Sequence, residues 1–380
     1  MKEKDEEKPN LLEYKKTHLN SLKPYIAGKS INEIAELYNL PTNSIIKLGS
    51  NENPLGSSPL AIEAINSYLN KNQFNFYPDA LGQSLAKNIR QKFPEIGQAE
   101  IIIGNGMDNV LEGIARLILR KGDKTLIHIP TFEYYEIITR WAEAEPIYYQ
   151  TKPSENFKIN LEEFLALIKP EVKIVFLCNP NNPTGNYLTW TEIEIIIKQA
   201  KKMGSFVFLD EAYIEYLGFE NSHINKVHKY DNLIIGRTFS KIYGLAALRI
   251  GWGVLPTNLI NEYRKVQTPF STNLLGLLAA EKALSDNEFI AKSLDNNKIG
   301  LTYLSNNLEN LDFKVFDSQA NFVAFQVSPK FKSKEFCEHL LKKGIIVRNA
   351  GLFNGAPDDL IRITIGNSEQ NAKLIQSLLI

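Results

Sequence analysis

The sequence contains few of the residues that build metal centres and disulfides. Only two cysteines occur among 380 residues, Cys178 and Cys337, and neither has the close partner that a zinc site or a redox motif requires. The five histidines form no His-Glu-x-x-His pattern. We therefore predict no structural metal, and a reducing compartment fits this low cysteine content.

The sequence also lacks an excess of either charge. Lys plus Arg and Asp plus Glu both total 43, so the formal net charge is zero and no bulk field attracts nucleic acid or acidic lipid. No uninterrupted apolar stretch is long enough to span a bilayer, and the first ten residues are mostly charged, unlike a secretory signal. These absences predict a soluble cytoplasmic protein whose partners are small molecules.

Helix-like and strand-like segments alternate between residues 57 and 256. The strand-like segments are short and apolar, and amphipathic stretches with apolar positions three and four apart separate them. The expected strands cover residues 101–104, 125–130, 146–150, 174–178, 206–209, 233–236 and 249–254. This alternation is typical of an α/β fold, in which helices cover both faces of a mainly parallel sheet.

A different pattern follows this region. A long helical stretch at 273–308 leads to strand-like segments at 313–327, 345–348 and 360–365 and to a closing helix at 372–379. A chain of this length is expected to form two domains. We predict a disordered tail, an N-terminal arm, a large domain and a smaller α+β domain, at residues 1–18, 19–48, 49–270 and 271–380, respectively.

Chemically reactive side chains follow several of the expected strands. Asp210 ends one strand, and Phe132, Asn182 and Lys241 follow closely after three others. Ligands of open α/β sheets bind beyond the carboxyl ends of the strands. We therefore expect these side chains to lie together in one site.

Lys241 has the surroundings of a reactive amine. Thr238 and Ser240 precede it, and Arg249 follows eight positions later. A nearby guanidinium lowers the pKa of a lysine, and a partly neutral amine can form a Schiff base with an aldehyde. The hydroxyls and the guanidinium can hold a phosphate beside it. The alternative interpretation is an ordinary surface lysine.

Asp210, Asn182 and Tyr213 suit the binding of a pyridine ring. An ionised carboxylate in a dry site can hold a proton on a pyridine nitrogen, although the commoner role of such an aspartate is a helix N-cap. Asn182 and Tyr213 can donate to a phenolate oxygen. Gly104-Asn-Gly106 precedes an expected helix whose free N–H groups favour phosphate. With Phe132 stacked on the ring, these features predict a site for pyridoxal phosphate.

Four motifs carry a resemblance to a known family. They are Asn-Asn-Pro-Thr-Gly185, Asp210-Glu-Ala-Tyr, Ser-Lys241 with the later Arg249, and Leu-Ile-Arg362-Ile-Thr-Ile-Gly366. Their order and approximate spacing resemble those of the class II, fold type I aminotransferases, and the resemblance covers nearly the whole chain from about residue 20. It implies pyridoxal 5′-phosphate as cofactor, a large domain with a mainly parallel seven-stranded sheet, and a smaller α+β domain.

The same resemblance implies a role for each matching residue. Lys241 binds the cofactor covalently and moves the substrate Cα proton, and Asp210 and Tyr213 complete the catalytic group. The remaining cofactor contacts are expected from Met107 and Asp108 through their backbone amides and from Phe132, Asn182, Thr238, Ser240 and Arg249. Tyr77 resembles the tyrosine that reaches the cofactor phosphate of the other subunit, which implies a homodimer with shared active sites. A cis peptide at Asn182-Pro183 is also implied.

Two arginines indicate an anionic substrate. Strand periodicity puts Arg362 on the face opposite Ile361 and Ile363, and a guanidinium there suits a carboxylate or phosphate. Arg348 is a second such residue. For each, the alternative is a strand-edge arginine in solvent.

The segments 22–40 and 50–56 resemble the amino terminus of histidinol-phosphate aminotransferases. That resemblance implies substrate contacts from Tyr25, Asn53, Arg348 and Arg362, and 2-oxoglutarate as amino acceptor. The implied reaction, in histidine biosynthesis, converts L-histidinol phosphate to imidazole-acetol phosphate and forms L-glutamate.

Three alternatives share parts of this pattern. An aromatic amino acid aminotransferase has the same amino-terminal motif and both arginines. A lyase that decarboxylates threonine phosphate needs the same cofactor linkage but breaks a different bond. A cofactor-binding regulator normally carries an added DNA-binding domain, for which we expect no room in the short charged tail.

Overall fold

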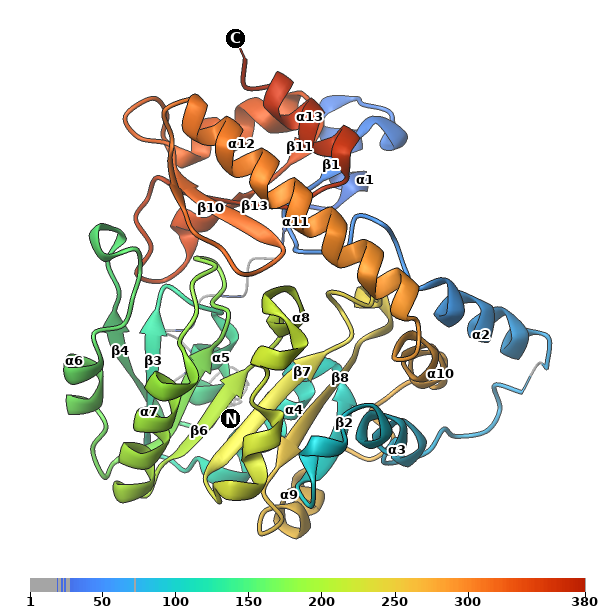
Figure 1. Cartoon of the computed structure of the whole chain (residues 1–380), viewed down its shortest axis with the longest axis vertical. Helices are drawn as coiled ribbons and strands as arrows, with labels where there is room; N and C mark the ends of the chain where they lie inside the picture. Colours follow the sequence, from blue (N-terminus) through green and yellow to red (C-terminus); the bar gives the residue numbers. More distant parts are fainter. Residues whose placement is uncertain (1–18, 20–21, 23, 25–27, 72, 380) are drawn as a thin grey trace, which may run out of the picture.

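The alternating segments of the sequence form one large sheet, which occupies the lower part of Figure 1. The computed structural model describes residues 19, 22, 24, 28–71 and 73–379. The strands of this sheet are β2 (Glu100–Asn105), β3 (Lys124–Ile129), β4 (Glu145–Gln150), β5 (Val172–Cys178), β6 (Phe206–Asp210), β7 (Leu233–Thr238) and β8 (Ile250–Leu255). Each of the predicted strands is present.

The seven strands lie in the order β2-β8-β7-β6-β5-β3-β4. All run parallel except β8, which is antiparallel to both of its neighbours. Every residue of β7 and β8 is buried, as expected for strands covered on both faces. The prediction of a mainly parallel seven-stranded sheet is therefore confirmed.

Alternate side chains of the strands build two cores, one on each face of the sheet. Val175 and Leu177 point into one core, whereas Ile174 and Phe176 point into the other, because successive side chains of a strand face opposite ways. The covering helices are α2 (Pro59–Leu69), α3 (Gln83–Lys92), α4 (Gly106–Ile118), α5 (Tyr134–Trp141), α6 (Leu161–Ala166), α7 (Trp190–Lys202), α8 (Ile214–Leu217), α9 (Ile260–Val266) and α10 (Leu274–Ala283).

The upper part of Figure 1 holds the smaller sheets. The helices and strands of this upper region are α1 (Ile31–Tyr38), β1 (Ile46–Lys47), α11 (Asn287–Asn310), β9 (Lys314–Phe316), β10 (Phe322–Gln326), α12 (Ser333–Lys342), β11 (Ile345–Ile346), β12 (Arg348–Asn349), β13 (Leu360–Thr364) and α13 (Ser368–Gln376). Strands β12, β13, β10 and β9 form an antiparallel sheet in that order, and β1 pairs with β11 in parallel.

Several boundaries in this region differ from the prediction. The expected strand 313–327 is two strands, β9 and β10, that pair with each other in antiparallel register. The expected helix 273–308 is two helices, because the Asp286 side chain accepts a hydrogen bond from the backbone N–H of Phe289 and starts α11 anew. The last helix begins at Ser368, earlier than expected, since Asn367 and Gln370 form a capping box.

The helices after residue 270 contact both sheets. Leu277 and Ala280 of α10 belong to a core of the large sheet, whereas Leu304 and Leu308 of α11 pack against the small sheet. The domain boundaries at residues 48 and 270 stay predictions, and the predicted tail 1–18 lies outside the described residues.

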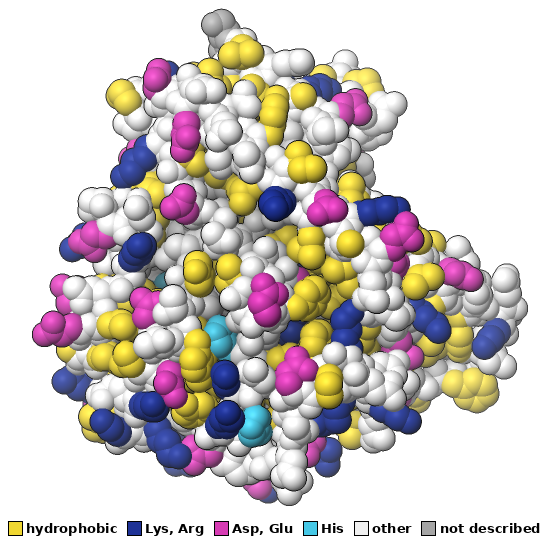
Figure 2. All heavy atoms as spheres, in the orientation of Figure 1, with side chains coloured by type: hydrophobic (Ala, Val, Ile, Leu, Met, Phe, Trp, Pro, Cys, Tyr) yellow, Lys and Arg dark blue, Asp and Glu magenta, His cyan; other side chains and the backbone are white. Residues whose placement is uncertain are grey.

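The face shown in Figure 2 has Lys and Arg side chains interspersed with Asp and Glu. It therefore carries no large field of one sign, in agreement with the zero net charge of the sequence. Among the described helices, none is long and apolar enough to cross a membrane.

Candidate functional site

A cavity of about 280 Å³ lies at the carboxyl ends of the parallel strands, where the large sheet faces the small one. Asp210 of β6 and Lys241, just after β7, line it from the large sheet, and Arg348 of β12 and Arg362 of β13 line it from the small sheet. The structure thus brings together residues that are far apart in the sequence, at the edge where the topology predicts a ligand.

Lys241 lies at this cavity and not in bulk solvent. Its Nζ is 5.4 Å from the centroid of the Tyr213 ring, and among the described residues no group accepts a hydrogen bond from it. Burial, and then the guanidinium of Arg362, lower its pKa to about 8. An amine with this pKa is partly neutral near physiological pH and can act as a nucleophile. The alternative of an ordinary surface lysine is wrong.

Asp210 is a buried carboxylate at the end of β6, with 2% of its surface exposed. Its Oδ1 accepts a hydrogen bond from the backbone N–H of Ala212 at 2.9 Å, and its Oδ2 accepts one from the Tyr135 hydroxyl at 2.5 Å. Burial raises the pKa of Asp210 to about 6. Within the described part of the chain, no Lys, Arg or His side chain lies within ion-pair distance of it. A protonated ring nitrogen would supply the missing cation.

The start of α4 and the end of β7 bring two hydroxyl groups and a guanidinium together. The Thr238 hydroxyl donates to Ser240 Oγ at 3.0 Å, and Arg249 donates to the same oxygen at 3.3 Å and to Asp108 Oδ2 at 2.9 Å. Gly106 has φ +76°, and a Cβ there would lie 2.5 Å from the Arg249 guanidinium. A side chain at this position would therefore collide with the guanidinium. Hydroxyls, a guanidinium and the first residues of a helix line the same cavity, and this donor set fits a phosphate.

The helix that begins at Gly106 presents the backbone amides of Met107 and Asp108 in its first turn. Amides in this turn have no partner within the helix. Both residues line the cavity, as does Phe132. The predicted cofactor contacts Met107, Asp108 and Phe132 therefore lie where a phosphate and an attached ring would need them.

Asn182 and Tyr213 have hydrogen bonds that orient their polar groups. Asn182 Oδ1 accepts from Arg362 at 2.5 Å, which leaves the amide NH₂ of Asn182 to donate. The Tyr213 hydroxyl accepts from Asn51 Nδ2 at 2.9 Å and keeps its own proton to donate. Burial raises the pKa of Tyr213 well above its usual value, so this proton is retained. The Asn182-Pro183 peptide is cis, as predicted.

Arg348 and Arg362 are opposite each other in the register of β12 and β13. Both are buried, with 8% and 4% exposure, so the alternative of strand-edge arginines in solvent is wrong. Arg362 donates to the carbonyl of Gly49 at 2.6 Å, and Arg348 lies 5.2 Å from the centroid of the Phe353 ring. Two buried guanidiniums on one wall make this end of the cavity suited to an anion.

Two predicted residues within the described part of the chain, Asn53 and Tyr77, do not line this cavity. Asn53 donates instead to the carbonyl of Ile242 and to Ser293 Oγ, both at 2.9 Å, and does not line the cavity. Its neighbour Asn51 does. The substrate contact of Asn53 stays a prediction, whereas Asn51, which has φ +54°, donates through its amide to the Tyr213 hydroxyl.

Tyr77 is 81% exposed and lies against the Phe270 ring, with centroids 4.6 Å apart. It is not part of the cavity of its own chain. Tyr25 lies outside the described residues.

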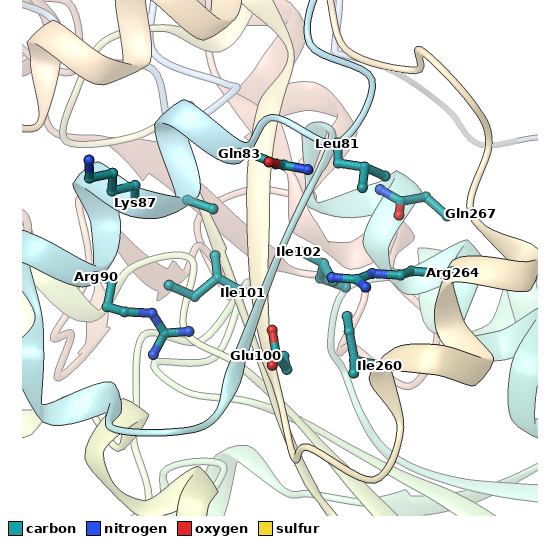
Figure 3. Close-up of a pocket in the computed structure, with 11 residues that line it drawn as sticks. Leu81, Gln83, Lys87, Arg90, Glu100, Ile101, Ile102, Ile260, Arg264 and Gln267 are labelled. Atoms are coloured by element: carbon teal, nitrogen blue, oxygen red, sulfur yellow. The ribbon is translucent and has the colours of Figure 1, made fainter.

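A second hollow lies along the edge strand β2, between α3 and α9 (Figure 3). Its Arg90 is engaged with the carbonyls of Gly97 and Ala99, the latter at 2.7 Å. Lys87 points away from the centre of the hollow in Figure 3. None of the predicted site residues lies there, and we assign it no chemistry.

Comparison with known proteins fits this geometry. The sequence pattern of the family described as aminotransferase class I and II matches residues 43–378. The chain belongs to this family. A histidinol-phosphate aminotransferase from Methanosarcina mazei is 43% identical to it over 363 residues, which cover 95% of each chain.

Solved aminotransferases have the same fold. The structure of the histidinol-phosphate aminotransferase from Clostridium acetobutylicum has a TM-score of 0.81 and 27% identity, over 88% of this chain and 98% of the other. The Sinorhizobium meliloti histidinol-phosphate aminotransferase in complex with pyridoxal-5′-phosphate has a TM-score of 0.84 and 22% identity, over 96% of each chain. The predicted fold type I architecture, aminotransferase class and cofactor, pyridoxal 5′-phosphate, are confirmed.

Proposed function

We propose that this aminotransferase transfers the amino group of L-histidinol phosphate to 2-oxoglutarate, giving imidazole-acetol phosphate and L-glutamate in histidine biosynthesis. The observation that carries the proposal is the pair of buried arginines, Arg348 and Arg362, opposite the phosphate site formed by α4 and Arg249. A donor with its own phosphate ester and an acceptor with a distal carboxylate can occupy this wall in turn. The names of the relatives at 43% identity support the same reaction.

Lys241 is the proposed covalent attachment point and the acid and base of the reaction. When bound, pyridoxal phosphate supplies an aldehyde that links to amines and a ring that accepts electrons. Lys241 Nζ accepts the proton from the substrate Cα, since its lowered pKa leaves a neutral fraction near physiological pH.

The other large-sheet residues hold the ring in our proposal. Asp210 keeps a proton on the ring nitrogen, and Asn182 and Tyr213 donate to the ring hydroxyl through the groups that their hydrogen bonds leave available. Phe132 packs on one ring face.

The phosphate is assigned to the backbone amides of Met107 and Asp108 with Thr238, Ser240 and Arg249. The support is that all five residues line one cavity, that Thr238 and Arg249 both donate to Ser240 Oγ, and that the Arg249 guanidinium lies beside Gly106.

The substrate side is assigned to Arg348, Arg362 and Tyr25, and we add Asn51 as the residue that orients Tyr213. Asn53 is reassigned from substrate contact to fixing the loop before α2, on the support of its two hydrogen bonds.

We also propose a homodimer in which Tyr77 contacts the cofactor phosphate of the other subunit, and a cytoplasmic location. Phe74, Phe76 and Tyr77 are exposed by 50%, 69% and 81% in the segment after α2, where apolar side chains gather at the right edge of Figure 2. Contiguous exposed apolar residues of this kind mark association surfaces.

An aromatic amino acid aminotransferase and a threonine-phosphate decarboxylase are the alternatives. The test compares turnover of histidinol phosphate, phenylalanine and threonine phosphate with 2-oxoglutarate, while glutamate and carbon dioxide are measured. We expect glutamate from histidinol phosphate and no carbon dioxide from threonine phosphate. Rapid turnover of phenylalanine without turnover of histidinol phosphate would overturn the proposal.

A further inference from the structure

Tyr135 does not line the cavity, but it contacts the carboxylate that does. It is completely buried, with 0% of its surface exposed, and its hydroxyl donates to Asp210 Oδ2 at 2.5 Å. Its ring lies parallel to that of Phe176 on β5, with centroids 4.9 Å apart and an interplanar angle of 6°. The stacked ring fixes the direction in which the hydroxyl points.

The proton of this hydroxyl stays on Tyr135. Burial and the charge of Asp210 raise the pKa of Tyr135 well above its ordinary value, so the group is a permanent donor. The second carboxylate oxygen, Oδ1, is held by the backbone N–H of Ala212. Each oxygen of a carboxylate can accept more than one hydrogen bond, and Asp210 therefore keeps capacity for a partner in the cavity.

We propose that Tyr135 is a positioning residue that holds Asp210 as an ionised carboxylate aimed at the cavity and so keeps the shared proton on the ring nitrogen of the cofactor. The proposal depends on the pairing of Asp210 with that nitrogen. A donor to a carboxylate stabilises its charge and lowers its affinity for protons. Without the hydroxyl, the buried carboxylate competes better for the proton, which then moves from the ring nitrogen to Asp210.

The substitution Tyr135→Phe tests this inference, because it removes the hydroxyl and keeps the ring that stacks on Phe176. Apoenzyme reconstituted with ¹⁵N-labelled pyridoxal phosphate is expected to show the resonance of a protonated ring nitrogen. In Tyr135→Phe we expect a shift toward the unprotonated resonance and a dissociation constant for the cofactor raised by about tenfold, the effect of one hydrogen bond to a charged group.

Tyr134 offers a matched control, since its hydroxyl donates to Glu112 rather than to Asp210. Tyr134→Phe is expected to leave the nitrogen resonance and the cofactor affinity at wild-type values. A shift of equal size in this control would overturn the assignment to the Tyr135 hydroxyl.

A double-mutant cycle with Asp210→Asn shows whether Tyr135 acts through Asp210. We expect Tyr135→Phe to change nothing further in the Asp210→Asn background. Equal losses in both backgrounds, or a wild-type resonance and affinity in Tyr135→Phe alone, would contradict the inference. A wild-type resonance in Asp210→Asn alone would instead refute the pairing of Asp210 with the ring, which is a failure of the proposed function.

Discussion

The two walls of the cavity are assembled in different ways. The large-sheet wall takes Asp210 and Lys241 from the ends of neighbouring strands, each next to the apolar segment that positions it. The opposite wall joins the loop at Asn51 to β13, where the backbone N–H of Asn51 donates to Thr364 Oγ1 at 2.9 Å, 313 residues away in the sequence. Local sequence specifies the first wall, whereas the second exists only after long-range packing.

The largest effect is expected on the large-sheet wall, from Lys241→Ala. Loss of the proposed attachment point and of the proposed acid and base should lower turnover of the amino donor by at least about a thousandfold. Steady-state assays of glutamate formation measure this loss. Lys265→Ala is the control, because Lys265 is exposed and paired with Glu262. Wild-type turnover in Lys241→Ala would show that the first wall is wrongly assigned.

On the opposite wall, Arg362→Ala should lower kcat/KM by about a hundredfold, since it removes a buried charge that also holds Asn182 and the Gly49 carbonyl. Both half-reactions should be impaired, because in the proposed function the donor and the acceptor bind the same guanidinium in turn. Single-turnover measurements with the amino donor and with the amino acceptor measure the two half-reactions separately. Impairment of only one half-reaction would contradict a shared binding wall.

The pH dependence of cofactor capture tests the lowered pKa of Lys241. Its pKa is lowered to about 8, and the neutral amine is the reactive form. Capture of pyridoxal phosphate by the apoenzyme should therefore speed up as pH rises, gain about tenfold between pH 7 and pH 9, and level off above that. Stopped-flow absorbance measures the rate. An inflection near 10.5, the ordinary value for lysine, would argue against a buried amine.

Asn51→Ala and Asn53→Ala separate the two asparagines of the loop. Asn51→Ala should reduce turnover by about fivefold through the lost hydrogen bond to Tyr213. Asn53→Ala should instead lower the free energy of unfolding, by about 1 kcal/mol for each of its two hydrogen bonds. Turnover assays and urea unfolding of both variants distinguish an effect on catalysis from an effect on stability. A larger loss of turnover in Asn53→Ala would restore the original assignment of Asn53.

The sequence predicted the large sheet well because its strands are apolar, short and separated by helices with a clear period. It failed where an element depends on its partners. The sequence pattern predicted a single strand where the structure has β9 and β10, because the pairing of these two strands is visible only in three dimensions.

Within the site, the motifs located Asp210, Asn182 and Lys241 but not Tyr135. The sequence contained one signal for Tyr135, which is that it follows Phe132 by three residues. In the structure Tyr135 lies at the start of α5, and the two rings meet edge to face with centroids 5.6 Å apart. Its hydrogen bond to Asp210 of β6 and its stacking on Phe176 of β5 depend on three-dimensional packing, which no local pattern contains.

The central claim is that Lys241 carries the cofactor in this cavity. Reduction of the holoenzyme with borohydride, followed by proteolysis and mass spectrometry, tests it directly. The account predicts one pyridoxyl-modified peptide, with the label on Lys241. A label on a different lysine, with Lys241 unmodified, would contradict it.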